Sequence, residues 1–234
     1  MNKNENWERY QKEIADDHYY FARSCIRQNF FPAAEDLFMK ILRDVLHKDI
    51  FDDPKQTSCT GIAYHSGLIP METTMSVVAR QFALMTEAGY RNFVCSCVTS
   101  FGIYTEVLET WKHFPDTEKK ARDILYRSCG KRFEIPENLV HTSDIIYKFR
   151  LDIEKQFRYY LKNQIDGKPI RVVDHIGCHY AKIFPEKGVG GAEYPYVLAG
   201  LTDAWGGEQV DYPERRHCCG FGFQIGRASC RERV

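Results

Sequence analysis

Hydrophobic residues follow two alternating spacings along the chain, one typical of strands and the other of helices. Short apolar runs predict strands at residues 18–22, leading to Cys25, at 92–95, and at 171–176, leading to Cys178. Apolar residues at helical spacing predict helices over 32–46, 70–89, 103–114, 116–129 and 143–163, the first two opened by Pro32 and Pro70. Strands that alternate with helices predict an α/β fold with parallel-type sheets.

The pattern divides the chain into a polar leader over residues 1–17, a first half over 18–142, a linking helix over 143–167 and a second half over 168–223. Residues 225–234 read like one translated frame of a short-read sequencing adapter, so we interpret 224–234 as an artefact and the second half as truncated. A genuine basic tail is the alternative. Sequencing the source locus past codon 223 distinguishes the two.

Composition narrows the classes of function. Lys and Arg number 32, as do Asp and Glu, so no overall charge favours nucleic acid or an anionic membrane as partner. The first residues lack the apolar core of a signal peptide, and no apolar run approaches the length of a membrane span, which predicts a cytoplasmic protein. In that reducing compartment, nine cysteines favour metal or redox chemistry over structural disulfides.

The cysteines of the second half have an informative spacing. A lone Cys178 is followed, after 39 intervening residues, by the adjacent pair Cys218 and Cys219, with Gly220 directly after them. Adjacent cysteines pair poorly as a disulfide, but two thiolates on one tight turn can bind neighbouring irons of one cluster. The spacing therefore indicates an iron–sulfur site.

The first half has cysteines in the same order. Cys25 is followed after 33 residues by the turn Cys59-Thr60-Gly61, and then by the segment Cys97-Val98-Thr99-Ser100. The two halves are therefore predicted to be repeats.

Each set of cysteines resembles the cysteine-rich CCG domain, and the tandem, with Gly177-Cys178-His179-Tyr180 and Asp211-Tyr212-Pro213, resembles the B subunit of heterodisulfide reductase over about residues 18–223. The resemblance implies two pseudo-repeated three-layer α/β halves joined by a long helix, each half holding a noncubane [4Fe-4S] cluster. It also implies reduction of a disulfide between the clusters with electrons from a ferredoxin-like C subunit. A flavin-containing A subunit commonly completes such a complex.

The resemblance also implies the ligands, which are Cys178, Cys218 and Cys219 for the second cluster and Cys25, Cys59 and Cys97 for the first. In the first half, Thr60 and Ser100 stand where cysteines are expected, and hydroxyl oxygens are poorer ligands of iron–sulfur clusters than thiolates. That site is left with three states: an altered cluster, an empty relic, or a full cluster with unusual ligands. Cys95 could substitute only if its strand slipped in register.

Other residues carry weaker signals. His179, beside Cys178, is the candidate to hydrogen-bond a cluster sulfur or to donate a proton to a departing thiolate. His65, His175 and His217 are more simply loop or structural residues, and an exposed loop position is the simplest interpretation of Tyr180 and Lys182. Cys129 fits no pattern and is interpreted as a small buried apolar residue.

Three functions remain open from the sequence. The first is an iron–sulfur oxidoreductase subunit that reduces a disulfide, although the truncated chain itself is expected to be inactive. The second is an electron-relay subunit of a lactate, glycolate or glycerol-phosphate oxidising complex. The third is a non-catalytic, metal-stabilised assembly protein, which as a zinc protein would be colourless.

Overall fold

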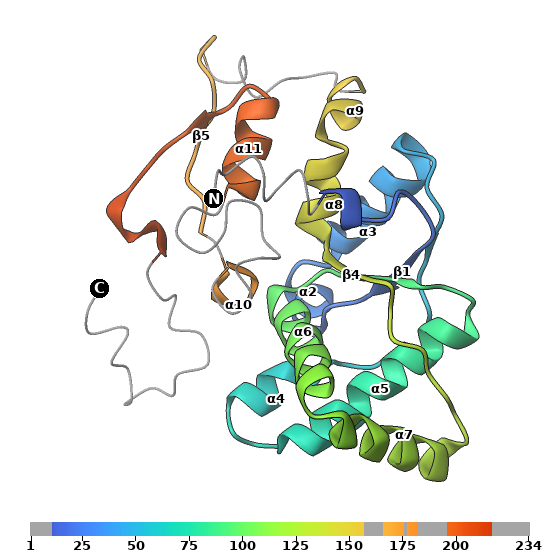
Figure 1. Ribbon diagram of the computed structural model, residues 1–234. Helices are drawn as coiled ribbons and strands as arrows, with labels where there is room; N and C mark the ends of the chain where they lie inside the picture. The colour runs from blue at the N-terminus through green and yellow to red at the C-terminus, as the bar shows by residue number, and fades with distance from the viewer. Residues whose placement is uncertain (1–10, 157–165, 176, 182–195, 217–234) are drawn as a thin grey trace.

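A four-stranded parallel sheet lies at the centre of the computed structural model, which describes residues 11–156, 166–175, 177–181 and 196–216 (Figure 1). The strand order is β2-β1-β3-β4, where β1 is Tyr19–Ala22, β2 is Ile50–Phe51, β3 is Asn92–Cys95 and β4 is Asn138–His141. Neighbouring strands are all parallel. The predicted α/β fold is therefore confirmed, as are the strands at 18–22, less its first residue, and at 92–95.

The two central strands are covered on both faces. The side chains of β1 from Tyr19 to Phe21 have no exposed surface, which is typical of a parallel sheet between helical layers. Tyr20 stacks on Phe93 of the adjacent strand with ring centroids 5.5 Å apart, and Phe21 stacks on Phe38 at 5.6 Å. These aromatic contacts hold β1 and β3 at the middle of the core.

Helices flank the sheet on both faces (Figure 1). On one side lie α5 (Met71–Glu87), α6 (Val98–His113) and α7 (Pro115–Cys129), and on the other lie α3 (Pro32–Lys40) and α8 (Thr142–Lys148). The predicted helices agree with α5 and α7, whereas α6 begins at Val98 instead of residue 103. A π-helical segment, Ile41–Val45, continues α3 and completes the predicted helix over 32–46.

The predicted continuous helix over 143–163 is wrong in its described part. Helix α8 ends at Lys148, and a separate helix α9 spans Arg150–Glu154. Between them Phe149 leaves helical geometry with φ −96° and ψ 13°, and its ring packs against the core with the Lys48 ammonium 5.0 Å from its centroid. The packing of this aromatic ring accompanies a break that the helical spacing did not reveal. Residues 157–163 of the prediction lie outside the described residues.

The second half of the chain contains a smaller parallel sheet. Strand β5 (Arg171–Val172) pairs with β6 (Glu208–Gln209), so the predicted strand over 171–176 is shorter than expected, and residue 176 lies outside the described residues. Helix α10 (Cys178–Ala181) packs on α6, and α11 (Val197–Ala204) packs on α8. The domain boundaries and the repeat remain predictions. Among the described helices, none has the length and apolar character needed to cross a membrane.

Candidate functional site

The three first-half cysteines lie in segments that follow the parallel strands. Cys25 is the first residue of α2 (Cys25–Phe30) after β1, Cys97 is the N-cap of α6 after β3, and Cys59 precedes α4 (Gly61–His65). Burial raises the pKa of the Cys59 thiol, and the charges of Cys97 and Cys25 raise it further. The structure thus brings these thiols within electrostatic reach of one another, where ligand sites of open parallel sheets usually form.

Cys59 lies in a small polar cradle. Its Sγ accepts a hydrogen bond from Ser100 Oγ at 3.1 Å and from the Gly61 N–H at 3.4 Å, while the side chain is 7% exposed. A Cβ atom on Gly61 would stand 2.8 Å from Ile103 Cγ1, so only glycine fits this close approach. Ser100, which replaces an expected cysteine, therefore contacts the thiol of Cys59 directly.

Thr60, the other departure from the expected cysteines, is engaged elsewhere. It adopts a left-handed backbone with φ +61°, and its hydroxyl donates to the Cys59 carbonyl at 2.6 Å. In the described part of the chain, no three His, Cys, Asp or Glu side chains converge as ligands of a metal ion. The chemistry of three neighbouring thiols fits an iron–sulfur cluster in kind, and the state of this first site remains a prediction.

The remaining described first-half cysteines are accounted for by the fold. Cys95 is fully buried and holds its place in β3, opposite Ala22 and His141, so its strand has not slipped in register. Burial raises the pKa of its thiol well above the usual value. The prediction that Cys129 is buried is wrong: it is the last residue of α7, one turn beyond the buried Leu125, and is exposed at the end of the helix.

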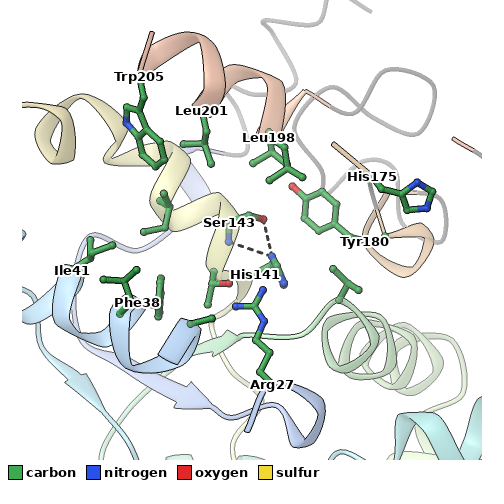
Figure 2. Close-up of a pocket in the computed structure, with 17 residues that line it drawn as sticks. Arg27, Phe38, Ile41, His141, Ser143, His175, Tyr180, Leu198, Leu201 and Trp205 are labelled. Atoms are coloured by element: carbon green, nitrogen blue, oxygen red, sulfur yellow. Dashed lines mark hydrogen bonds between the residues drawn. The ribbon is translucent and has the colours of Figure 1, made fainter. Parts of the chain in front are cut away.

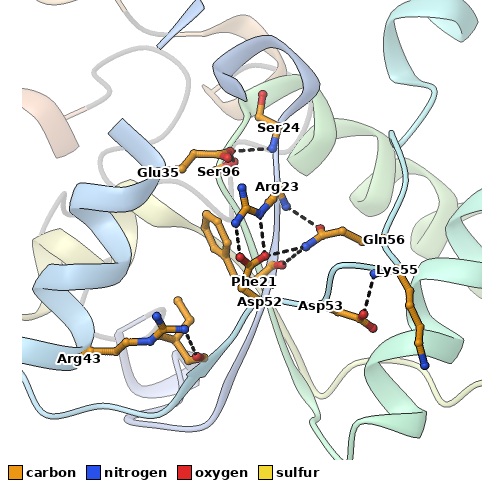
Figure 3. A network of polar contacts seen from close by, with 11 residues as sticks. Phe21, Arg23, Ser24, Glu35, Arg43, Asp52, Asp53, Lys55, Gln56 and Ser96 are labelled. Atoms are coloured by element: carbon orange, nitrogen blue, oxygen red, sulfur yellow. Dashed lines mark hydrogen bonds and ion pairs between the residues drawn. The ribbon is translucent and has the colours of Figure 1, made fainter. Parts of the chain in front are cut away.

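A network of polar contacts fixes the segments that carry Cys25 and Cys59 (Figure 3). Arg23, just after β1, forms an ion pair with Asp52, and its Nε donates to Asp52 Oδ1 at 2.7 Å. Gln56 accepts from the Arg23 N–H at 2.8 Å and donates to the Phe21 carbonyl at 3.2 Å.

The buried carboxylate of Glu35 completes this network (Figure 3). It accepts hydrogen bonds from the Ser24 N–H at 2.7 Å and from the Ser96 hydroxyl. Ser24 directly precedes Cys25 and Ser96 directly precedes Cys97, so one carboxylate positions two of the cysteine-bearing turns.

In the second half, the structure describes only one of the three proposed ligands. Cys178 is exposed at the start of α10, whereas Cys218 and Cys219, with His217, lie outside the described residues. Lys182 lies outside them as well. The geometry of the second site is therefore defined by Cys178 and by the segment that approaches Cys218.

Asp174 holds that approaching segment beside β5. Its buried carboxylate forms an ion pair with Arg215, with Nε 2.6 Å from Oδ1, and accepts from Gln209 Nε2 at 3.0 Å. The Tyr212 hydroxyl donates to the Asp174 carbonyl at 2.7 Å. The Asp211-Tyr212-Pro213 segment is thus tied to the strand end that leads to Cys178.

His179, in α10 of the second half, contacts residues of the first half. Its ring stacks on that of His65 with centroids 4.3 Å apart, and its Nδ1 lies 3.3 Å from Thr99 Oγ1. Burial, and then the charge of His65, lower the pKa of His179. No local pattern indicates this stacked pair, because the two residues are far apart along the chain.

Two glycines make the contact between α10 and α6 unusually close. A Cβ atom on Gly102 would stand 3.0 Å from His179 Cβ, and one on Gly177 would stand 2.8 Å from Val98 Cγ2. His175 is exposed, but Tyr180 is buried, with its hydroxyl donating to Asp144, so the interpretation of Tyr180 as an exposed residue is wrong. Its ring fills the space between α10 and the end of β4.

Comparisons with known proteins give one consistent set of relatives. No family model matches the chain. It is 24% identical over 221 residues to the B subunit of the ferredoxin:CoB-CoM heterodisulfide reductase of Methanosarcina acetivorans, covering 91% of this chain and 68% of the relative. The B subunit of a ferredoxin/F420H2-dependent CoB-CoM heterodisulfide reductase of the same organism is 25% identical, with 86% and 64% covered.

A third relative and one solved structure extend these comparisons. The B subunit of the ferredoxin:CoB-CoM heterodisulfide reductase of Methanosarcina mazei is 24% identical, with 85% of this chain and 63% of the relative covered. The chain therefore spans about two thirds of the length of these relatives. A hypothetical protein from Helicobacter pylori shares the fold, with a TM-score of 0.56, 9% identity, and 91% of this chain and 39% of that chain covered. The chain is accordingly a distant relative of the B subunits of heterodisulfide reductases.

Proposed function

We propose that this chain is the disulfide-reducing subunit of a cytoplasmic iron–sulfur oxidoreductase. The observation that supports the proposal best is the gathering of Cys25, Cys59 and Cys97 at the carboxyl ends of β1 and β3 and in the turn before α4, with the Cys178 helix packed on α6. Thiols from separate segments at one edge of a parallel sheet are what a cluster-binding site requires.

The reaction is the two-electron cleavage of a disulfide. One R–S–S–R′ takes up two electrons and two protons, its S–S bond breaks, and two thiols leave. An iron–sulfur cluster supplies single electrons to such a reaction when it is bound. His179 is the candidate to hydrogen-bond or protonate a departing thiolate, on the geometry of its place beside Cys178 and between the two regions.

The residues divide into two proposed sites. The second half holds a noncubane [4Fe-4S] cluster on Cys178, Cys218 and Cys219, whereas the first half holds an altered cluster or none. Ser100 supports this difference between the two sites. It stands where a further thiolate would bind iron, and its hydroxyl instead donates a hydrogen bond to the Cys59 Sγ.

Partners and substrate follow from the relatives. Their names specify ferredoxin or F420H2 as electron source and the CoB-CoM heterodisulfide as substrate. For this chain, the corresponding proposal is electron supply through a ferredoxin-like C subunit, a complex completed by a flavin-containing A subunit, and a low-molecular-weight disulfide as substrate.

The test uses the protein expressed from its own locus and purified without oxygen. We expect about four irons per chain and oxidation of reduced viologen dye on addition of a disulfide. Cys178→Ser should remove most of the iron and the activity, while the control Cys129→Ser, at an exposed cysteine, should retain both. A colourless zinc protein would contradict the proposal, and a brown protein inactive with every disulfide tried would favour electron relay.

A further inference from the structure

A cavity of about 500 Å³ lies between the sheet region and the second half, on the α3 and α8 side of the sheet (Figure 2). Its volume is within the usual range of sites for small molecules. The walls come from α3, α8 and α11, and they are mainly apolar, formed by Leu37, Phe38, Ile41, Ile146, Leu198 and Leu201. An occupant of this cavity needs an apolar body.

One buried polar atom in the wall has no partner. The ring of His141 is 4% exposed, and the Ser143 N–H donates to its Nδ1 at 3.2 Å. Since Nδ1 accepts, the proton of the neutral ring is on Nε2, and that atom has no hydrogen-bond partner among the described residues. A buried donor left unsatisfied costs about 1–3 kcal/mol, so a ligand that accepts from Nε2 would be favoured.

A cation stands beside this donor. Figure 2 shows the guanidinium of Arg27, from α2, directed towards the His141 ring. Arg27 forms no ion pair with any carboxylate in the described ranges. Burial, and secondarily the charge of Arg27, lower the pKa of His141 to about 3, so at neutral pH the ring is an uncharged donor next to a positive charge.

Other polar groups of the wall already have protein partners. The Tyr180 hydroxyl donates to Asp144, and the Trp205 Nε1–H donates to the Arg150 carbonyl at 3.2 Å. Recognition of a polar head therefore falls to Arg27 and His141. A carboxylate placed between them would accept a charge-assisted hydrogen bond from each.

We infer that this cavity binds a small aliphatic carboxylate, with its chain against the apolar walls and its head between Arg27 and the Nε2–H of His141. The site uses none of the proposed cluster ligands, so the inference stands or falls independently of the proposed function. The ligand class follows from the combination of one orphaned donor, one unpaired cation and an apolar volume.

Calorimetric titration of the protein with octanoate tests the site. Octanoate should bind saturably, whereas acetate, which lacks the chain, and octanol, which lacks the charge, should bind at least about tenfold more weakly. Equal binding of octanol would overturn the role of the head group. Absence of octanoate binding would overturn the site itself.

Variants locate the binding to this cavity. Arg27→Gln should weaken octanoate at least about tenfold, while Arg127→Gln, the same change at an exposed position on α7, should have no effect. Leu198→Trp fills the cavity and should abolish binding. Arg27 and Leu198 are partly exposed, so their variants are expected to fold, and a circular dichroism melt checks this. Octanoate affinity unchanged in both variants would overturn the inference.

Discussion

The hydroxyl of Ser100 donates a hydrogen bond to the Sγ atom of Cys59 across 3.1 Å, within the cradle that also contains the Gly61 N–H. A hydroxyl in this position stands where a further thiolate is expected, and it is a poorer ligand of iron than a thiolate. The contact gives a structural basis for the view that the first site differs from the second, and it makes that difference testable.

Restoring the expected cysteines should restore a first cluster. The double variant Thr60→Cys/Ser100→Cys adds two thiols beside Cys59, and we expect its iron content after anaerobic purification to rise by about four per chain. Iron is measured by mass spectrometry. The matched control, Ser76→Cys/Ser128→Cys, adds thiols at partly or fully exposed helical positions and should leave iron unchanged. An unchanged content in the first variant would count against the altered-site prediction.

The Asp174 carboxylate should be essential for the second region. Asp174→Ala removes the carboxylate that pairs with Arg215 and accepts from Gln209, and loss of one partner of a largely buried ion pair should lower the free energy of unfolding by about 3 kcal/mol. The control Glu208→Gln disrupts an exposed ion pair with Arg171 and should cost less than about 1 kcal/mol. Urea titration measures both, and equal effects would contradict the role of Asp174.

Because α10 packs closely on α6, Gly102→Ala is predicted to destabilise the protein, the opposite of its usual effect inside a helix. Alanine is favoured over glycine inside a helix by about 0.5–1 kcal/mol, so an uncontacted Gly102→Ala would stabilise α6. Because the new Cβ would stand 3.0 Å from His179 Cβ, we expect a net loss of about 1 kcal/mol instead.

Denaturant unfolding and protease sensitivity measure the effect of Gly102→Ala. Thr110→Ala, on the same helix, serves as control because its hydroxyl only bonds back to the Glu106 carbonyl. A more stable Gly102→Ala variant would show that α10 is not packed there.

His141 should make the fold sensitive to acid. Its pKa is lowered to about 3, mainly by burial, so between about 6.5 and 3 the unfolded chain binds a proton that the folded chain refuses. The contribution of His141 to the free energy of unfolding is therefore at its full value above pH 6.5. It declines as the pH falls through that window, by a few kcal/mol in all.

Other groups also titrate in this window, so the comparison is between the protein and its His141→Phe variant. Free energies of unfolding are measured from pH 7.5 to 4. The variant should lose less stability over this range, by at least about 1 kcal/mol. Parallel profiles would show that folding does not lower the pKa of His141.

The sequence predicted the parts of the fold whose signals are local. The run at Asn92–Cys95 is uniformly apolar after its first residue and ends at a cysteine-bearing turn, and the strand has those limits in the structure. The grouping of Cys25, Cys59 and Cys97 was implied by the resemblance to the CCG domain, and the structure brings the three thiols within electrostatic reach of one another.

What the sequence did not predict depends on long-range packing. Strand β2 has only two residues, and β4 has its first two side chains partly exposed, so neither produces a readable pattern. The break at Phe149 and the stacking of His65 on His179 arise from contacts between distant segments. Local spacing carries no information about such contacts.

The pairing order of the central sheet also determines when the cysteines first meet. Strand β1 pairs with β3, and β3 with β4, so the first sheet is complete only when the chain has been made as far as His141. Until Cys97 has left the ribosome, Cys25 and Cys59 have no third thiol beside them. Pairing over such distances is slow, so the three thiols stay apart during much of synthesis. The order of translation, and not only the final geometry, thus sets the earliest point at which the three thiols can act together.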